Sequence, residues 1–209
     1  MKLPFFTFGF FLVRGVLVTL LWVTEGFGVI SGDGTNSGCS LELTDLMTEL
    51  SREPERKVQF REEKFLSNLE IPLKAEGTLY FKAPDHLEKL IKKPQKEHLV
   101  VHQNRVSISD EDQQNIRTFS LDRYPPLKEL LNAIRYTLGG NLKALTTHYE
   151  LTFKGSCNFW HLIMIPKFSA ATEIVKRIDF FGSNNQISRM KWLEPNGDYT
   201  ILYLLNNEP

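Results

Sequence analysis

The chain contains 209 residues, of which 42% are hydrophobic, and its 25 basic and 25 acidic side chains give a formal net charge of zero. This length predicts one globular domain rather than two. Proteins that bind nucleic acid or anionic membranes through their overall field carry a basic excess, so the balanced charge argues against both partners.

The first part of the chain differs in composition from the rest. Residues 1–28 are almost wholly apolar, with a basic n-region up to Arg14 and an apolar stretch over residues 15–23. The small residues Gly26 and Gly28 then suit signal peptidase. This pattern predicts a signal peptide that is cleaved after residue 28.

An uncleaved membrane anchor is the alternative for this segment. Residues 5–23 are long enough to span a bilayer, but Arg14 at their middle would cost about 2.5 to 3.5 kcal/mol there. We therefore expect a cleavable signal peptide over residues 1–28 and an exported mature chain of 209 − 28 = 181 residues.

The two cysteines leave two states open. Residues 29–40 form a linker rich in glycine, serine and asparagine, and the domain itself is expected over residues 41–209. Outside the cytoplasm, Cys39 and Cys157 form either a disulfide or two free thiols, and spacing does not decide between them. A lipid-attachment site at Cys39 fits poorly, because Asn36 replaces the expected aliphatic residue.

Three segments show helical periodicity. The first covers Leu43–Leu50, and the second is an amphipathic stripe over Leu127–Leu138 that Gly139 and Gly140 end. A shorter helix is expected over Asn141–Thr147.

Most of the remaining chain alternates apolar and polar side chains, as strands with one buried face do. The first such run begins at Arg56. The others cover Leu73–Lys82, His86–Lys93, Glu97–His102, Arg105–Ser109, Ile116–Leu121, Tyr149–Lys154, Phe159–Ile165, Glu173–Phe181, Ile187–Leu193 and Asp198–Leu205. The short spacing predicts a mainly β (α+β) domain with an antiparallel sheet that curves around its helices. Periodicity does not say whether the curved sheet encloses a filled core or a cavity.

A set of short motifs in a fixed order identifies a family resemblance. They occur in VQFREEKFLSNLEIPLKAEGTLYFKAPDHLEKLIKKPQKEHLVV and in the C-terminal WLEPNGDYTILYL. The distinctive residues are Gln59, Phe60, Gly77, Leu79, Phe81, Pro84, Asp85, Leu87 and Pro94. In these motifs and in element order, nearly the whole mature chain resembles the LolA-like outer-membrane lipoprotein carriers, specifically their divergent LolA-related branch.

The resemblance implies a half-closed antiparallel β-barrel of about eleven strands with a helical lid and an apolar interior for acyl chains. It implies a monomeric periplasmic carrier, without a cofactor, that receives its client from an inner-membrane donor and passes it to an outer-membrane acceptor. In LolA proteins an arginine that resembles a latch precedes the proline of this motif, and here Ala83 occupies that position. We therefore expect no guanidinium latch between barrel and lid.

Alternation and the resemblance together give a set of candidate residues for the cavity and lid. They are Leu79, Phe81, Phe119, Leu131, Ile134, Phe153, Trp160, Leu162, Met164, Phe180, Trp192 and Tyr203. An acyl chain needs such a wall because each buried methylene contributes about 0.8 kcal/mol and requires no directional partner. The alternative is that each of these side chains is an ordinary core residue, and only the resemblance favours a cavity.

Other chemistry has little support in the sequence. The histidines show no metal-ligand spacing apart from His98 and His102, which share one face of a strand, so no metal site is expected. There is no nucleophile elbow, phosphate loop or HExxH motif, so we expect no enzyme. A lysine cluster that includes Lys89 and Lys93 is expected to be a solvated strand edge rather than a docking patch.

The sequence thus predicts a periplasmic carrier that binds the acyl part of a lipid or lipoprotein for transfer towards the outer membrane. The stripe Leu127–Leu138 is the expected lid. The alternative is a lipid-sensing or scaffold module of the cell envelope that transports nothing.

Overall fold

The computed structural model describes residues 39–110, 115–168 and 172–205. The expected signal peptide over residues 1–28 and nearly all of the expected linker lie outside the described residues. None of the helices within the described ranges has the length and apolar character needed to cross a membrane.

The described chain contains eleven strands and four helical segments. The helical segments are α1 (Leu43–Ser51), the 3₁₀ turn η1 (Leu121–Arg123), α2 (Pro125–Leu138) and α3 (Leu142–His148). The strands are β1 (Glu55–Phe65), β2 (Leu73–Lys82), β3 (His86–Lys93), β4 (Glu97–His102), β5 (Arg105–Asp110), β6 (Arg117–Ser120), β7 (Tyr149–Ser156), β8 (Phe159–Pro166), β9 (Arg177–Ser183), β10 (Gln186–Leu193) and β11 (Tyr199–Leu205).

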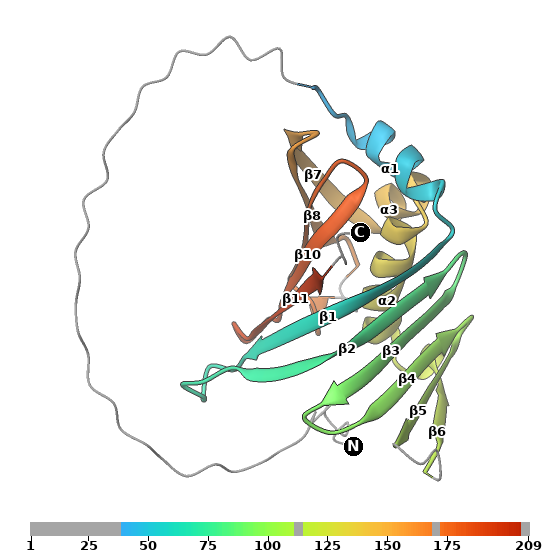
Figure 1. Cartoon of the computed structure of the whole chain (residues 1–209), viewed down its shortest axis with the longest axis vertical. Helices are drawn as coiled ribbons and strands as arrows, with labels where there is room; N and C mark the ends of the chain where they lie inside the picture. The colour runs from blue at the N-terminus through green and yellow to red at the C-terminus, as the bar shows by residue number, and fades with distance from the viewer. Residues whose placement is uncertain (1–38, 111–114, 169–171, 206–209) are drawn as a thin grey trace, which may run out of the picture. The chain divides into compact units, whose positions relative to one another are not determined.

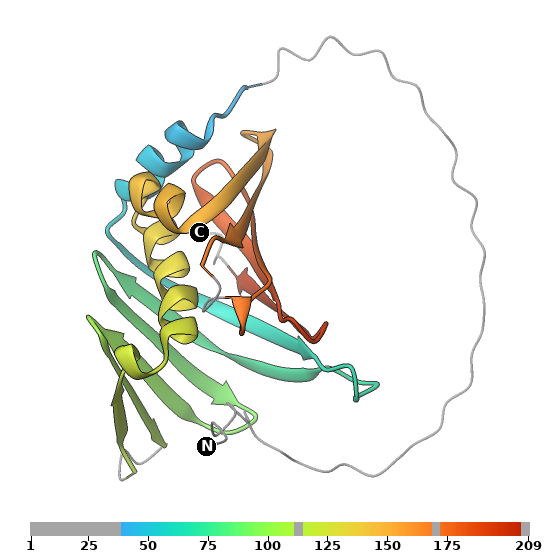
Figure 2. The same ribbon diagram turned by 180° about the vertical axis from the view of Figure 1, so that it is seen from behind.

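All eleven strands form one antiparallel sheet in the order β6-β5-β4-β3-β2-β1-β11-β10-β9-β8-β7. Strand β1 pairs with β11, so the first and last strands of the chain lie together at the middle of the sheet. Strands β6 and β7 are its two edges, and they do not pair with each other, so the barrel is open. The sheet curves around α2 and α3, which connect these edges (Figures 1 and 2). The predicted half-closed antiparallel barrel is confirmed.

Local sequence explains where the helices begin and end. Proline at the first positions suits the start of α2, where no backbone N–H is needed. Its end is sharp because Gly140 has φ +65°, and a Cβ there would lie 2.1 Å from the carbonyl oxygen of Met47. Asn141 then caps α3 by accepting a hydrogen bond from the backbone N–H of Ala144 at 3.0 Å.

Two predicted strand boundaries are wrong. Strand β9 begins at Arg177 instead of Glu173, because Glu173 and Ile174 form a turn that places Val175 in the core at 2% exposure. The segment predicted to end β6 at Leu121 instead turns into η1, where the Ser120 hydroxyl accepts the backbone N–H of Asp122 at 3.3 Å. A local turn therefore replaces the predicted start of β9 and the predicted end of β6.

The two cysteines form a disulfide. Cys39 and Cys157 are bonded with their Cα atoms 5.6 Å apart, and the bond closes a loop across 118 positions of the chain. Beside it, Ser40 forms an isolated antiparallel bridge with Ser156 at the end of β7. The disulfide state, one of the two that the sequence left open, is therefore the observed one, and it excludes lipid attachment at Cys39.

Opening this disulfide is expected to lower the stability of the folded domain. A cross-link over a loop of this length constrains the unfolded chain, so replacing both cysteines with serine should lower the free energy of unfolding by about 2 to 5 kcal/mol. Urea titration of the oxidised, reduced and serine-substituted proteins measures this. The reduced and serine-substituted proteins should have the same urea midpoint. If the oxidised protein had that midpoint too, the result would contradict the disulfide.

Candidate functional site

The pairing register defines two faces of the sheet. Leu87, Val101, Val106 and Phe119 stand opposite one another on successive strands from β3 to β6. They pack against Leu127, Leu131 and Ile134 of α2 in one hydrophobic cluster. We call the side of the sheet that carries this cluster the helix-facing face and the other side the outer face.

Nearly all predicted cavity residues belong to the helix-facing face. Following the paired residues from β6 through β1 and β11 to β7 places these strand residues on it: Leu79, Phe81, Phe119, Phe153, Trp160, Leu162, Met164, Phe180 and Trp192. Leu131 and Ile134 of α2 pack onto the same face. Apolar side chains from both halves of the chain therefore share one face of the sheet.

Tyr203 is the exception, and its placement in the cavity wall is wrong. It pairs with Arg61 of β1 and Arg189 of β10 on the outer face, and the Arg61 guanidinium lies 4.9 Å from its ring centroid. In β11 both alternating sets are apolar, and Leu202 and Leu204 take the helix-facing positions. Alternation alone does not decide the face of such a strand.

Burial divides the remaining eleven residues into two groups. Trp160, Leu162, Met164 and Phe180 are completely buried by the protein's own atoms, and Phe81 is 3% exposed. The other six are partly exposed: Leu79, Phe119, Leu131, Ile134, Phe153 and Trp192. The first group forms a filled core, while the second can contact a ligand without rearrangement of the core.

Charged residues interrupt this apolar face. Lys89 stands beside Leu79 on the helix-facing face, and its Nζ donates to Glu62 Oε2 of β1 at 2.5 Å. Their side chains are only 15% and 10% exposed, and the ammonium lies 5.2 Å from the ring centroid of Phe60. The expectation that Lys89 lies on a solvated edge is wrong. The alternation of Leu87, Lys89 and Ile91 in β3 already placed the lysine on the buried face.

Glu97 of β4 adds a second carboxylate to the same face. It pairs with Ile91 of β3, which lies two residues after Lys89 on the same strand. Burial raises the pKa of the Glu97 carboxyl, and the charge of Lys89 only partly opposes this. Elsewhere on the same face, the Thr200 hydroxyl of β11 is buried without a partner among the described residues. The helix-facing face therefore combines an apolar surface with a small polar group.

Two arginines tie the helices to the sheet. Arg56 of β1 is paired with Phe81, and its guanidinium donates to the carbonyl oxygens of Leu138 at the end of α2 (2.7 Å) and Leu50 of α1 (2.6 Å). The last carbonyls of a helix have no partner within it and carry partial negative charge, so a guanidinium stabilises them strongly.

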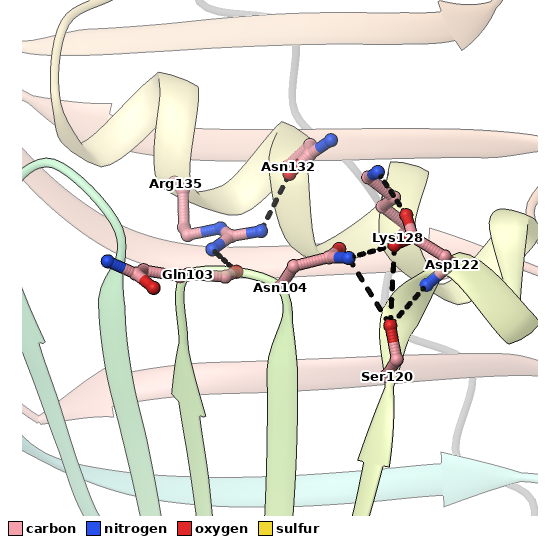
Figure 3. A network of polar contacts seen from close by, with 7 residues as sticks. All are labelled: Gln103, Asn104, Ser120, Asp122, Lys128, Asn132 and Arg135. Carbon is pink, nitrogen blue, oxygen red and sulfur yellow. Dashed lines mark hydrogen bonds and ion pairs between the residues drawn. The ribbon is translucent and has the colours of Figure 1, made fainter.

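Arg135 makes the reverse connection, from α2 to the sheet. Its guanidinium donates to the backbone oxygens of Gln103 (2.8 Å) and Asp85 (3.1 Å) and to Asn132 Oδ1 (2.7 Å), as Figure 3 shows for Gln103 and Asn132. Its pKa is lowered by burial. The expected absence of a guanidinium contact between barrel and helices is therefore wrong, because other arginines supply it in place of Ala83.

The histidines lie mainly on the outer face. His86 and His98 contact the two oxygens of Glu88 at 2.6 and 3.2 Å. Burial raises the pKa of Glu88, but hydrogen bonds from these two histidines outweigh burial, and the pKa lies below its ordinary value. Across the described ranges, no three histidine, cysteine or acidic side chains are arranged to hold a metal ion.

The raised pKa of Glu97 gives a pH-dependent prediction. The folded protein favours the neutral carboxyl, so stability is fully present below the ordinary glutamate pKa and is lost as pH rises through the folded value. Glu97→Gln should therefore raise the urea midpoint at pH 7 and leave it unchanged at pH 3.5. The control is Glu150→Gln, on the exposed part of β7. A midpoint for Glu97→Gln below that of the parent at pH 7 would contradict the burial argument.

Removing the Arg56 guanidinium should loosen the ends of α1 and α2. Arg56→Gln leaves two helix carbonyls without their charged donor, and we expect a loss of about 1 to 3 kcal/mol in unfolding free energy. Amide hydrogen exchange should rise first in the last turns of both helices. Arg61→Gln is the matched control, since Arg61 lies on the same strand with its side chain 54% exposed. Equal effects of the two substitutions would refute a specific role of Arg56.

Solved structures similar to this chain include a LolA superfamily protein from Nitrosomonas europaea (8% identity, TM-score 0.45, 81% of this chain and 96% of that one). A DUF1329 family protein from Desulfovibrio piger has 11% identity and a TM-score of 0.44, and the match covers 78% of this chain and 89% of that one. A putative outer membrane lipoprotein-sorting protein domain from Vibrio parahaemolyticus has 7% identity, a TM-score of 0.42 and coverage of 78% and 90%.

No curated protein matches the sequence. One family profile, described as outer membrane lipoprotein carrier protein LolA-like, matches residues 35–203. This match covers nearly all of the described sheet and every helix within the described ranges. The chain therefore belongs to the LolA-like outer membrane lipoprotein carrier family.

Proposed function

We propose that this protein is an exported, periplasmic carrier that binds the acyl part of a lipid or lipoprotein on the helix-facing face of its sheet. The observation that carries the proposal is the mainly apolar character of that face, where six of the predicted residues, two of them on α2 itself, remain partly exposed. An acyl chain gains free energy from contact with such a surface in proportion to the area it buries.

In this proposal α2 acts as the lid. Its apolar stripe packs on β3 to β6, and its Thr137 hydroxyl lies 3.9 Å from the Met164 sulfur of β8 in the other half of the sheet. Outward movement of α2 would expose apolar residues of both halves at once. The contacts made by Arg56 and Arg135 oppose this movement, so they would set how readily a ligand enters.

The role proposed here requires no bond to be made or broken. An inner-membrane donor and an outer-membrane acceptor would supply and receive the client, and a monomer would suffice because each chain carries the whole face. The family description supports a lipoprotein client. Free lipid is equally compatible with a surface that recognises only methylene groups.

A lipid-sensing or scaffold module of the envelope is the second candidate. The complete burial of Trp160, Leu162, Met164 and Phe180 favours it, because a filled core leaves less room for a cargo. In addition, the Trp160 indole N–H is already bonded to the carbonyl oxygen of Asn184 at 2.8 Å, which fixes the ring in place.

Ligand occupancy distinguishes the two candidates. Native mass spectrometry with organic extraction of the mature protein from its own periplasm should show an acylated species, and the purified protein should bind a fluorescent fatty acid. Leu131→Asp places a charge beneath α2 and should weaken fatty-acid binding by at least about tenfold, since a charge within an apolar site costs several kcal/mol.

The control for this experiment is Ile165→Asp, because Ile165 is apolar and 43% exposed on the outer face. It should leave fatty-acid binding unchanged. An empty protein that takes up no fatty acid would reject the carrier role and favour the scaffold. Equal loss in both variants would show that binding does not depend on the helix-facing face.

A further inference from the structure

A separate pocket lies at the β5–β6 edge of the sheet. It has a volume of about 310 Å³ and is lined by Asn104, Arg105, Thr118, Phe119, Ser120 and Arg123. This volume is at the lower end of the range for small-molecule sites, about 300 to 1,000 Å³. Arg105 stands opposite Ser120, and Thr118 opposite Ser107, on the outer face. Arg105, Thr118 and Ser120 therefore line the pocket from the outer face, while Phe119 lines it from the helix-facing face at the edge of the sheet.

The pocket carries two cationic groups that the fold does not use. Arg105 is the first residue of β5, and Arg123 is the last residue of η1. Neither guanidinium has a hydrogen-bond or ion-pair partner among the residues that the structure describes. Arg56 and Arg135, in contrast, use their guanidinium groups to hold helices. Two unpaired guanidinium groups on one pocket favour an anionic ligand.

The nearby carboxylate is already engaged. Asp122 Oδ1 lies 2.8 Å from Lys128 Nζ on α2, while Oδ2 accepts from the side chains of Asn104 and Ser120 (Figure 3). The hydrogen bond from Lys128 lowers the pKa of Asp122, so the group is ionised and neutralises Lys128. The charges of Arg105 and Arg123 therefore remain for a ligand.

A neutral donor stands beside the two arginines. The hydroxyls of Thr118 and Ser107 are 3.1 Å apart and share one hydrogen bond, so one of the two keeps a proton to donate elsewhere. Two guanidinium forks and a hydroxyl offer more donors than the two oxygens of a carboxylate can accept. A phosphate group, with oxygens on three or four sides, matches this donor set better.

We propose that this pocket binds a phosphate group, either of a lipid headgroup or of a soluble phosphate compound. The pocket shares Asn104 and Ser120 with the polar network at η1, just before α2 (Figure 3). In addition, the backbone N–H of Leu121 donates to the carbonyl oxygen of Asn104 at 2.8 Å. A phosphate bound here is therefore held next to the base of α2. The site does not rest on the proposed acyl binding, because its two cationic groups, Arg105 and Arg123, do not belong to the acyl surface.

The test measures binding of inorganic phosphate by calorimetry and binding of vesicles by co-sedimentation, with phosphatidylglycerol vesicles compared with phosphatidylcholine vesicles. The pocket variant is Arg105→Gln with Arg123→Gln. The control is Arg61→Gln with Arg117→Gln, which removes the same charge from two exposed arginines that do not line the pocket. The pocket variant should lose at least about tenfold in phosphate affinity, and the control should lose little.

The vesicles identify the source of the phosphate. Selective loss of phosphatidylglycerol binding in the pocket variant would indicate a lipid headgroup, while loss of phosphate binding alone would indicate a soluble compound. The proposal is overturned if the parent protein binds neither probe, or if both double variants lose binding equally. Fatty-acid binding, measured on the same proteins, should be unchanged in the pocket variant, so failure of the carrier role and failure of this site are distinguishable.

Discussion

The pairing of β1 with β11 is the contact on which the rest of the structure depends. Seven residue pairs, from Gln59 with Leu205 to Phe65 with Tyr199, join a six-stranded half to a five-stranded half. Each half consists of hairpins between neighbours in the chain, but this pairing spans the whole domain. Because it places the chain ends at the middle, β6 and β7 become the edges, and the segment between them must cross the sheet. That segment contains α2 and α3, so their position over the curved face follows from topology.

The helix-facing face carries charged residues at two positions along β1. Arg56 lies at the end of β1 where α1 and α2 terminate, and Glu62 lies six residues further along the same face. The first charge is neutralised by helix carbonyls and the second by Lys89. Both charges therefore have partners although they lie on a mainly apolar face. A buried ion pair of this kind contributes little net stability, but removal of one partner is costly.

The turn between β4 and β5 connects the two faces of the sheet. Gln103 accepts a hydrogen bond from Arg135 of α2, while its neighbour Asn104 reaches η1 and lines the pocket on the outer face. Gln103 has a positive φ of +52°, so the chain reverses tightly and presents adjacent residues in different directions. Of two adjacent residues, Gln103 therefore anchors the helix that we propose as a lid, and Asn104 lines the proposed phosphate site.

The sequence by itself determined the elements and most of their faces. Period-two alternation placed nearly every strand, and it assigned Phe81, Leu162 and Phe180 to one side because a strand turns its side chains strictly in alternation. It failed at Tyr203, since both faces of β11 are apolar, and at the ends of β6 and β9, where local turns take over. The family motifs supplied the half-closed form of the barrel, which alternation does not contain.

Only the tertiary structure decided which polar groups meet. Arg56 and Leu138 are 82 residues apart, and nothing in the local sequence of either one indicates their hydrogen bond. The same holds for Cys39 and Cys157, and for Arg105 and Arg123, which reach one pocket from separate elements. Alternation reports only which side chains of one strand share a face of the sheet. Contacts between distant segments depend on strand order and register, and these are fixed by packing of the whole chain.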